Sequence, residues 1–279
     1  MPGLRKPGAG RFFYPRRGYG QISEAFQAAA VASGAIVLLN ATATAVDVRQ
    51  DRVRHVEVET HGERRVFPAT HVLSTIPVTL LARLVRRDVL APIGAAESLK
   101  QRAMVLVYLT LARERFTEFD AHYFPEETIR ITRVSEPKNY SLTTRPGRTV
   151  VCAELPCGMD GTEWSMRDED LGALVVRDLQ QAGLGPIGHV LAVHTERLPH
   201  AYPLYTKGYR QAFDALDRWV SGIDGPLTFG RQGLFAHDNT HHAMAMAYAL
   251  VDCLGDDGAF DRDAWACART SFEDHVVED

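Results

Sequence analysis

The chain has 279 residues, of which 46% are hydrophobic and 24% charged, a composition typical of a folded globular protein rather than a disordered one. Its formal net charge of −4 shows no basic excess, which argues against nucleic-acid binding and against a role at anionic membranes. The longest apolar runs, 243–254 and 104–112, are shorter than the roughly 20 residues that cross a bilayer, and the N-terminus carries no apolar signal segment, so no spanning segment and a cytoplasmic location are expected.

The first third of the chain predicts a helix, a meander and two buried strands. Residues 21–33 have a helical apolar face that ends at Gly34, and 35–39 predict a short buried strand. Segments 42–49, 53–60 and 64–68 alternate as three strands joined by two-residue turns. A further strand at 71–75 and a helix at 78–85 follow. A meander between two buried strands indicates an excursion from an α/β sheet that the chain then rejoins.

From residue 92 the pattern changes to longer strands rich in β-branched and aromatic residues. A helix at 93–101 precedes predicted strands at 104–112, 122–124, 129–134, 149–155 and 189–198, which favour one mostly antiparallel sheet. Residues 168–182 predict a helix with one apolar face formed by Leu171, Leu174, Val175 and Leu179. We therefore expect a mixed α/β (α+β) fold with parts at 1–91, 92–205 and 206–279.

The most informative stretch runs from residue 226 to 254. A short apolar strand leads into a turn that contains Gly230 and Gly233, and a helix follows whose first turn offers Asp238, Asn239 and Thr240 as caps. The free N–H groups at such a helix start favour an anion or an electron-rich ring edge, and glycines let a ligand approach the main chain. The stretch therefore predicts a helix N-terminus that faces a ligand.

Metal and nucleophile chemistry have weak support. His237, His241 and His242 lie near Asp238, but a helix that starts near Asn239 leaves His237 outside it, so capping is favoured over zinc and no metal site is predicted. The cysteines lack the spacing of a zinc set or a redox pair and are interpreted as reduced core thiols; they are Cys152, Cys157, Cys253 and Cys267. No serine lies in a nucleophile motif, so the catalytic residues stay unknown.

Four polar residues are candidates for a substrate pocket. Arg130 and Arg133 belong to a predicted strand end and could hold a carboxylate or phosphate, although exposed salt bridges explain them equally well. Tyr202 and Tyr205 could form a pocket wall, with a core aromatic pair as the alternative. The turn at Gly18 and Gly20 lacks the third glycine of a dinucleotide-binding fingerprint, and a tight turn with two solvated arginines is the favoured interpretation.

Three stretches, taken in order, resemble the flavin amine oxidase and protoporphyrinogen oxidase superfamily, which also includes UDP-galactopyranose mutase. The first is Phe13-Tyr14-Pro15-Arg16-Arg17-Gly18-Tyr19-Gly20 with the helix after it, Gly34 to Asn40, the meander and Leu73-Ser74-Thr75-Ile76-Pro77. The second is Arg133-Val134-Ser135-Glu136-Pro137-Lys138-Asn139-Tyr140-Ser141. The third and most specific joins Ala201 to Tyr205, Gly230 to Phe235 and Asp238 to Met244. Together they cover nearly the whole chain.

The resemblance implies an FAD-binding domain, with its meander, interleaved with an antiparallel-sheet-plus-helices substrate domain. Residues that it places beside FAD are Gly230, Arg231, Gly233, Leu234, Phe235, Asn239, His241, His242, Ala243, Asn40, Ala43, Thr75 and Pro77. Residues that it places on the substrate side are Arg130, Arg133, Asn139, Tyr140, Tyr202 and Tyr205. The implied activity is FAD-dependent oxidation of a small organic substrate.

The sequence departs from that superfamily at its start. Its members begin with a strand, a Gly-x-Gly-x-x-Gly turn and a helix that cradle the FAD pyrophosphate, and the residues before Arg11 are too few for this unit. The chain therefore resembles the C-terminal two thirds of a flavoprotein, and we expect weak FAD binding by it alone. Partners expected on this basis are a small-molecule substrate and either a separate Rossmann-bearing subunit or a second copy of the chain. The alternative functions are a mutase-like isomerase acting on a nucleotide sugar and a non-catalytic, split or remnant subunit.

Overall fold

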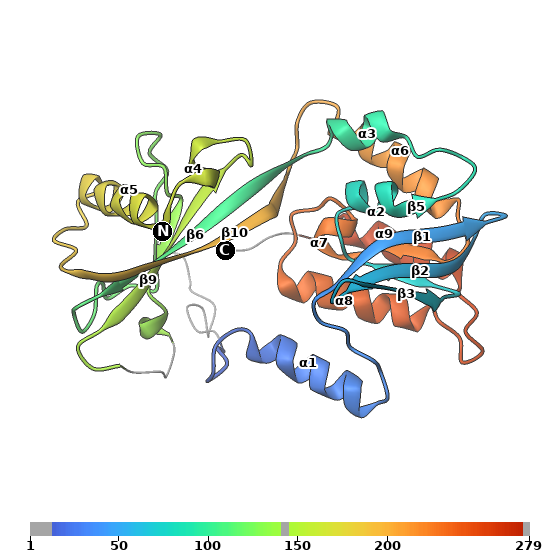
Figure 1. Cartoon of the computed structure of the whole chain (residues 1–279), viewed down its shortest axis with the longest axis horizontal. Helices are drawn as coiled ribbons and strands as arrows, with labels where there is room; N and C mark the ends of the chain where they lie inside the picture. The colour runs from blue at the N-terminus through green and yellow to red at the C-terminus, as the bar shows by residue number, and fades with distance from the viewer. Residues whose placement is uncertain (1–12, 141–144, 276–279) are drawn as a thin grey trace, which may run out of the picture. The chain divides into compact units, whose positions relative to one another are not determined.

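The computed structural model describes residues 13–140 and 145–275, which divide into two compact units (Figure 1). Unit 1 combines residues 1–38 with 103–199, and unit 2 combines 39–102 with 200–279. Each unit is therefore built from two separated parts of the sequence. The division predicted at residues 91 and 205 stays a prediction about domains.

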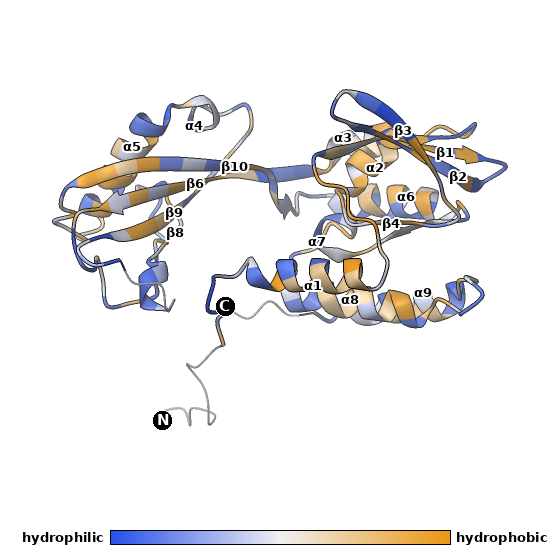
Figure 2. Cartoon of the chain, turned by 60° about the horizontal axis from the view of Figure 1, so that its bottom comes forward, coloured by the Kyte–Doolittle hydropathy of each residue, from blue (hydrophilic) through white to orange (hydrophobic). Residues whose placement is uncertain are grey.

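Unit 1 contains the five-stranded sheet, in the order β10-β6-β9-β8-β7. The strands are β6 (Lys100–Leu111), β7 (Ala121–Tyr123), β8 (Arg133–Ser135), β9 (Thr149–Cys157) and β10 (Val190–Leu204). β9 runs antiparallel to both β6 and β8, and β8 runs antiparallel to β7. Alternate residues of β9 face the core, as a sheet covered on one side requires, and Figure 2 shows hydrophobic stretches along β6 and β9.

Helix α5 (Asp168–Gln181) supplies the cover for that sheet. Its apolar face buries Leu171, Leu174, Val175 and Leu179 completely, which confirms the predicted amphipathic helix. Gly172 explains how closely the helix approaches β10, because a Cβ atom there would lie 2.6 Å from a methyl group of Val193. The remaining helices of unit 1 are α1 (Gln21–Ala32), η1 (Pro137–Asn139) and α4 (Thr162–Ser165).

Unit 2 contains the predicted meander, as the sheet β3-β2-β1-β5. Its strands are β1 (Ala41–Arg49), β2 (Arg52–Thr60), β3 (Glu63–Pro68) and β5 (Val85–Arg86); β5 is parallel to β1 and the others are antiparallel. Both hairpin turns have positive φ at their two central residues, Gln50-Asp51 and His61-Gly62, the conformation that matches the twist of tight hairpins.

A second, two-stranded parallel sheet in unit 2 joins β4 (Val72–Ser74) to β11 (Pro226–Thr228). Gly225 precedes β11 with φ of +114°, and a Cβ atom there would lie 2.6 Å from the carbonyl oxygen of Thr70. Glycine is therefore required where the chain enters this sheet. Around both sheets the unit carries helices α2 (Val78–Leu84), α3 (Ile93–Ser98), α6 (Tyr209–Ser221), α7 (Gly230–Gly233), α8 (Thr240–Asp252) and α9 (Arg262–Phe272).

Unit 2 has its own cores. Leu81 of α2 and Leu216 of α6 are buried with Ile223 and the inner residues of β1. Leu250 of α8 and Trp265 of α9 form a smaller cluster of their own. None of the helices in the described residues is both long and apolar enough to span a membrane.

Three local expectations from the sequence were wrong. Residues 35–39 form no strand, and Ile36 and Leu39 are 84% and 68% exposed, because no described strand pairs with this apolar run. Within 129–134 only the last two residues belong to β8, since the earlier backbone turns to bond with α5 and β9. Cys267 lies on the exposed face of α9 rather than in a core, although all four cysteines lie outside disulfide bonds.

Candidate functional site

The segment from β11 through α7 to α8 passes directly against the end of β4. The Phe229 N–H donates to the carbonyl oxygen of Ser74 at 3.2 Å. Gly230 has φ of +72°, and a Cβ atom on Gly233 would lie 3.1 Å from that same Ser74 oxygen. The two glycines are therefore explained by main-chain conformation and close backbone packing. Both are buried, and the Gly230 N–H donates to Sδ of Met246 on α8 at 3.2 Å.

Helix α8 begins with a capping box. Asn239 is the N-cap, its side chain accepts from the N–H of the third helical residue, and its own N–H donates to Nδ1 of His242 at 3.2 Å. Of the three predicted caps, the structure selects Asn239. The cap satisfies part of the first turn and leaves other N–H groups at the positive end of the helix dipole without a partner inside the helix.

Two buried polar atoms of α7 and of the adjoining strand β4 have no hydrogen-bond partner among the described residues. They are Ser74 Oγ, on β4, and Arg231 Nε, on α7. Buried polar atoms normally find a partner, because leaving one unpaired costs free energy. Glycine backbone, a helix N-terminus and unpaired donors together are a set that fits the phosphate and ring-edge groups of a dinucleotide cofactor.

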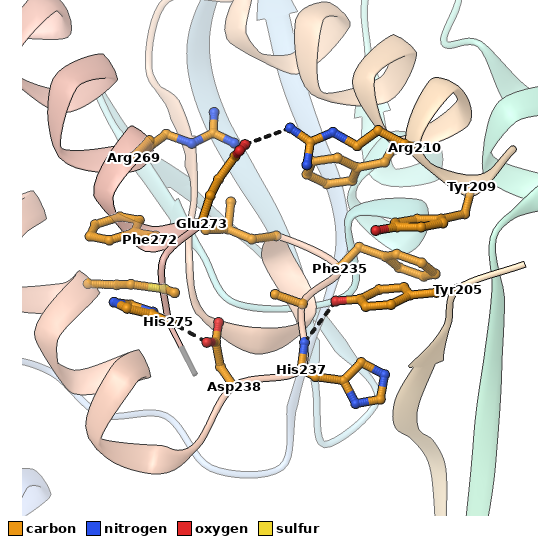
Figure 3. A pocket seen from close by; sticks show the side chains of 14 residues that line it. Tyr205, Tyr209, Arg210, Phe235, His237, Asp238, Arg269, Phe272, Glu273 and His275 are labelled. Atoms are coloured by element: carbon orange, nitrogen blue, oxygen red, sulfur yellow. Dashed lines mark hydrogen bonds and ion pairs between the residues drawn. The ribbon is translucent and has the colours of Figure 1, made fainter. Parts of the chain in front are cut away.

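A pocket of about 540 Å³ lies on the other side of this segment (Figure 3). The Tyr205 ring stacks on Tyr209 with 4.3 Å between centroids, and the Tyr205 hydroxyl accepts the His237 N–H at 3.0 Å. Arg210, next to Tyr209 on α6, pairs with Glu273 at the end of α9 at 2.6 Å. Of the predicted site residues, Tyr205, Leu234 and Phe235 line this pocket.

Arg231 connects a predicted cofactor residue to a predicted substrate residue. Its guanidinium lies 4.3 Å from the ring centroid of Tyr202, within the range of a cation–π contact. Tyr202 in turn stacks on His237, with 5.8 Å between ring centroids. The structure therefore brings Tyr202, Tyr205 and Arg231 together in one aromatic and cationic group.

The other predicted cofactor residues also lie in unit 2 but differ in exposure. Exposed residues, open to a ligand, are Asn40, Ala43, Thr75 and His241; half-buried are Leu234, Asn239 and Ala243. Phe235 is only 2% exposed and packs against the Phe213 ring. Pro77 is buried at the start of α2, and the His242 side chain turns toward Asp238.

The other four predicted substrate residues lie in unit 1, where each has a structural partner. Arg133 pairs with Glu154 and lies over the Tyr123 ring, and Arg130 contacts Glu163 at 3.7 Å. The Asn139 amide donates to the carbonyl oxygens of Thr117 and Phe119, at 3.0 and 2.7 Å. The Tyr140 ring contacts Tyr14 edge to face at 4.9 Å, and burial raises the pKa of its phenol.

One side-chain cluster escaped prediction. Asp238, His242 and His275 offer ligand atoms that all lie within 4.8 Å of one another. Burial, followed by the nearby His241 and His275, lowers the pKa of His242, so its imidazole is held toward the neutral form. His275 carries no local signal in the sequence, because its partners lie more than 30 residues earlier and only the packing of α8 against α9 brings them together.

Comparisons with known proteins show a shared fold. No family model matches the chain, and no curated protein matches its sequence. Among solved structures, reduced UDP-galactopyranose mutase matches with a TM-score of 0.72 and 16% identity over 86% of this chain and 51% of the mutase. A protein from Exiguobacterium sp. 255-15, named as a protoporphyrinogen oxidase, matches with a TM-score of 0.62 and 18% identity over 80% of this chain and 48% of its own.

A redesigned double mutant of putrescine oxidase matches with a TM-score of 0.55 and 17% identity, over 76% of this chain and 47% of the oxidase. The chain thus spans about half the length of these three structures. The fold similarity that the sequence motifs indicated is confirmed for the part of the flavoenzyme fold that this chain contains.

Proposed function

We propose that unit 2 forms one wall of an FAD site in a flavin-dependent oxidoreductase that oxidises a small organic substrate. The observation that carries this proposal is the β11–α7–α8 segment, in which a glycine turn against β4 leads into the capped start of α8. The similarity to flavoenzyme structures supports it, because 86% and 80% of this chain, and not the segment alone, match two of them.

The residues of this wall would bind and orient the cofactor. The open N–H groups at the start of α8 favour a phosphate or the pyrimidine edge, Arg231 adds a fixed positive charge, and Gly230 and Gly233 hold the turn closely against β4. FAD bound there would supply the hydride acceptor, while the protein sets orientation and electrostatics. Tyr202 and Tyr205, which share contacts with Arg231 and His237, would lie on the substrate side of that wall.

The second candidate is an isomerase of the mutase kind, acting on a nucleotide sugar. The mutase match, with a TM-score of 0.72, favours it. In that case Arg130 and Arg133 would hold the diphosphate, but each would have to exchange a carboxylate partner, Glu163 or Glu154, for the ligand. A non-catalytic or split subunit is the third candidate, since the chain spans about half of the matched enzymes.

FAD titration of the purified chain, followed by flavin fluorescence and equilibrium dialysis, tests the proposed wall. Arg231→Gln removes its charge and is expected to weaken FAD binding about tenfold, the loss of one charge-assisted contact. Arg218→Gln, at an exposed arginine of α6, is the matched control and should bind FAD like the unaltered chain. FAD binding that is absent, or that Arg231→Gln leaves unchanged, contradicts the proposal.

Substrate tests separate the three candidate functions. Reduction of bound flavin by an amine or a porphyrinogen without a nucleotide supports the oxidoreductase, whereas nucleotide-sugar binding that depends on reduced flavin supports the mutase. Because the chain spans about half of the matched enzymes, both assays are repeated with any Gly-x-Gly-x-x-Gly segment encoded next to it. Failure of both assays under both conditions supports the non-catalytic subunit.

A further inference from the structure

Three side chains meet where the start of α8 lies close to the end of α9. Asp238 lies just before the N-cap of α8, His242 is in its first turn, and His275 lies three residues beyond the end of α9. Asp238 Oδ1 is 3.3 Å from Nδ1 of His242. It is also 3.3 Å from Nδ1 of His275, the contact that Figure 3 draws at the pocket. The carboxylate therefore lies between two imidazole nitrogens.

The surroundings fix this cluster in place. The Asp238 side chain is 3% exposed and the His242 side chain 11%, while that of His275 is 20% exposed. The Phe272 ring, at the end of α9, packs against Trp265 and lies 5.5 Å from the His275 ring. The packing of α9 on α8 thus brings His275 to the other two residues.

The hydrogen bonds of the cluster leave a place for a cation. His242 Nδ1 accepts the Asn239 N–H in the capping box, which requires that this nitrogen carry no proton. The same nitrogen faces a carboxylate oxygen at 3.3 Å, so two acceptors point at each other. In addition, the buried Asp238 Oδ2 has no hydrogen-bond partner among the described residues. Asp238 Oδ1 lies within hydrogen-bond distance of His275 Nδ1, but the unpaired Oδ2 leaves this buried carboxylate only partly compensated. Such a group is costly at this depth, and a bound cation would remove the cost.

We propose that Asp238, His242 and His275 form a three-ligand site for a divalent transition-metal ion of the zinc type. Two ligand atoms on a tetrahedral ion with bonds of about 2.0 Å lie about 3.3 Å apart, which matches both oxygen–nitrogen distances here. Two imidazoles and one carboxylate are a ligand set that zinc accepts, with a fourth position left for water. The pocket, which Asp238 and His275 line, has room for that water.

Metal binding requires one ring to turn. The His242 and His275 rings are stacked, 4.3 Å apart and within 12° of parallel, and the lone pair of each nitrogen lies in its ring plane. One ion cannot lie in both planes while they are parallel. His275, the more exposed of the two and outside the helices, is the ring that turns. His242 Nδ1 has a single lone pair, so metal binding exchanges its hydrogen bond from the Asn239 N–H for a bond to the ion.

Zn²⁺ and Co²⁺ titrations of the chain without any affinity tag test the site. We expect one ion per chain by calorimetry, the visible absorption of tetrahedral Co²⁺, and a shift of the His275 ring resonances in NMR spectra. His275→Gln removes one ligand at a position that packs little core, and metal affinity is expected to fall about 100-fold or more. Asp238→Asn keeps the side-chain volume and should lower the affinity to a similar extent.

His189→Gln is the matched control, because His189 is an exposed histidine of unit 1, outside the cluster. Its metal affinity should equal that of the unaltered chain. Unfolding curves without metal confirm that each variant is folded. The proposal is overturned if no ion binds at micromolar concentration, or if His275→Gln and His189→Gln bind Zn²⁺ equally. Neither readout depends on FAD, so failure of the flavin proposal leaves this test intact.

Discussion

The environment of Cys152 shows how burial can dominate the chemistry of a side chain. Cys152 pairs across the sheet with Tyr108, on neighbouring strands of unit 1. Burial raises the pKa of the Cys152 thiol to about 11 and that of the Tyr108 phenol to about 12. Because the thiolate is the reactive form, Cys152 is a poor nucleophile near neutral pH.

Alkylation with iodoacetamide at pH 8, followed by peptide mass spectrometry, should therefore modify Cys267 first. Cys267 is exposed, whereas Cys157 and Cys253 are buried. The rate at Cys152 should keep rising with pH up to about 11, since the thiolate fraction grows until the pH passes the thiol pKa. Modification of Cys152 at pH 8 as fast as Cys267 contradicts this prediction.

For single residues, the sequence predicted roles that depend on neighbours within one helical turn, and it missed contacts with residues far along the chain. The N-cap at Asn239 was predicted, because a cap depends on residues within one turn. The place of His275 was not, since its partners come from another helix. Arg130 and Arg133 were ambiguous in the sequence, and their ion pairs depend on carboxylates more than 20 residues away.

Between elements, buried carboxylates replace missing backbone partners. Glu136 is 0% exposed and accepts the N–H groups of Phe116 and Thr117 at 2.9 and 2.8 Å, together with the Thr149 hydroxyl. It thereby joins the loop after β6, the start of β9 and its own turn. In the sequence Glu136 belongs to the stretch that resembles the flavoenzyme superfamily, but its contacts are structural.

Glu136→Ala should destabilise unit 1 by about 3 kcal/mol or more, because it leaves at least two backbone N–H groups without an acceptor. Glu136→Gln keeps one acceptor oxygen and should cost less. Urea unfolding measured by circular dichroism gives the free energies, with Glu127→Ala as a control at an exposed glutamate of the same region. Equal stability of Glu136→Ala and Glu127→Ala would show that the buried carboxylate contributes nothing.

Element prediction succeeded where one periodic face or one turn decides the structure. The helix α5 and the meander β1–β3 were predicted nearly to their ends, because apolar spacing and the two hairpin turns specify them locally. The strand expected at 35–39 failed because a strand needs a neighbour, and apolar composition does not reveal whether one is present. The two-stranded pairing of β4 with β11 joins residues about 150 apart and was equally invisible.

Over the whole molecule, each unit has a hydrophobic core of its own. The core of unit 1 lies between α5 and the five-stranded sheet, and the main core of unit 2 lies among α2, α6 and β1. The fold class followed from the change in pattern near residue 92. The sequence did not reveal which segments join in one unit. The chain leaves unit 2 at residue 102 and returns to it at residue 200, each time through a long strand that looks continuous in the sequence.

Because the two units have separate cores, we expect a substitution in one core to affect the unfolding of its own unit only. Leu174 in unit 1 and Leu216 in unit 2 are both 0% exposed, and replacing either with alanine should cost about 2–5 kcal/mol. Trp164 packs on the core of unit 1, whereas Trp219 and Trp265 belong to unit 2. Urea unfolding is followed by fluorescence in two backgrounds, one that retains only Trp164 and one that lacks it.

We expect Leu174→Ala to lower only the unfolding midpoint that Trp164 reports, and Leu216→Ala to lower only the midpoint measured in the background without Trp164. Equal shifts of both midpoints by either substitution would mean that the two cores unfold as one cooperative structure.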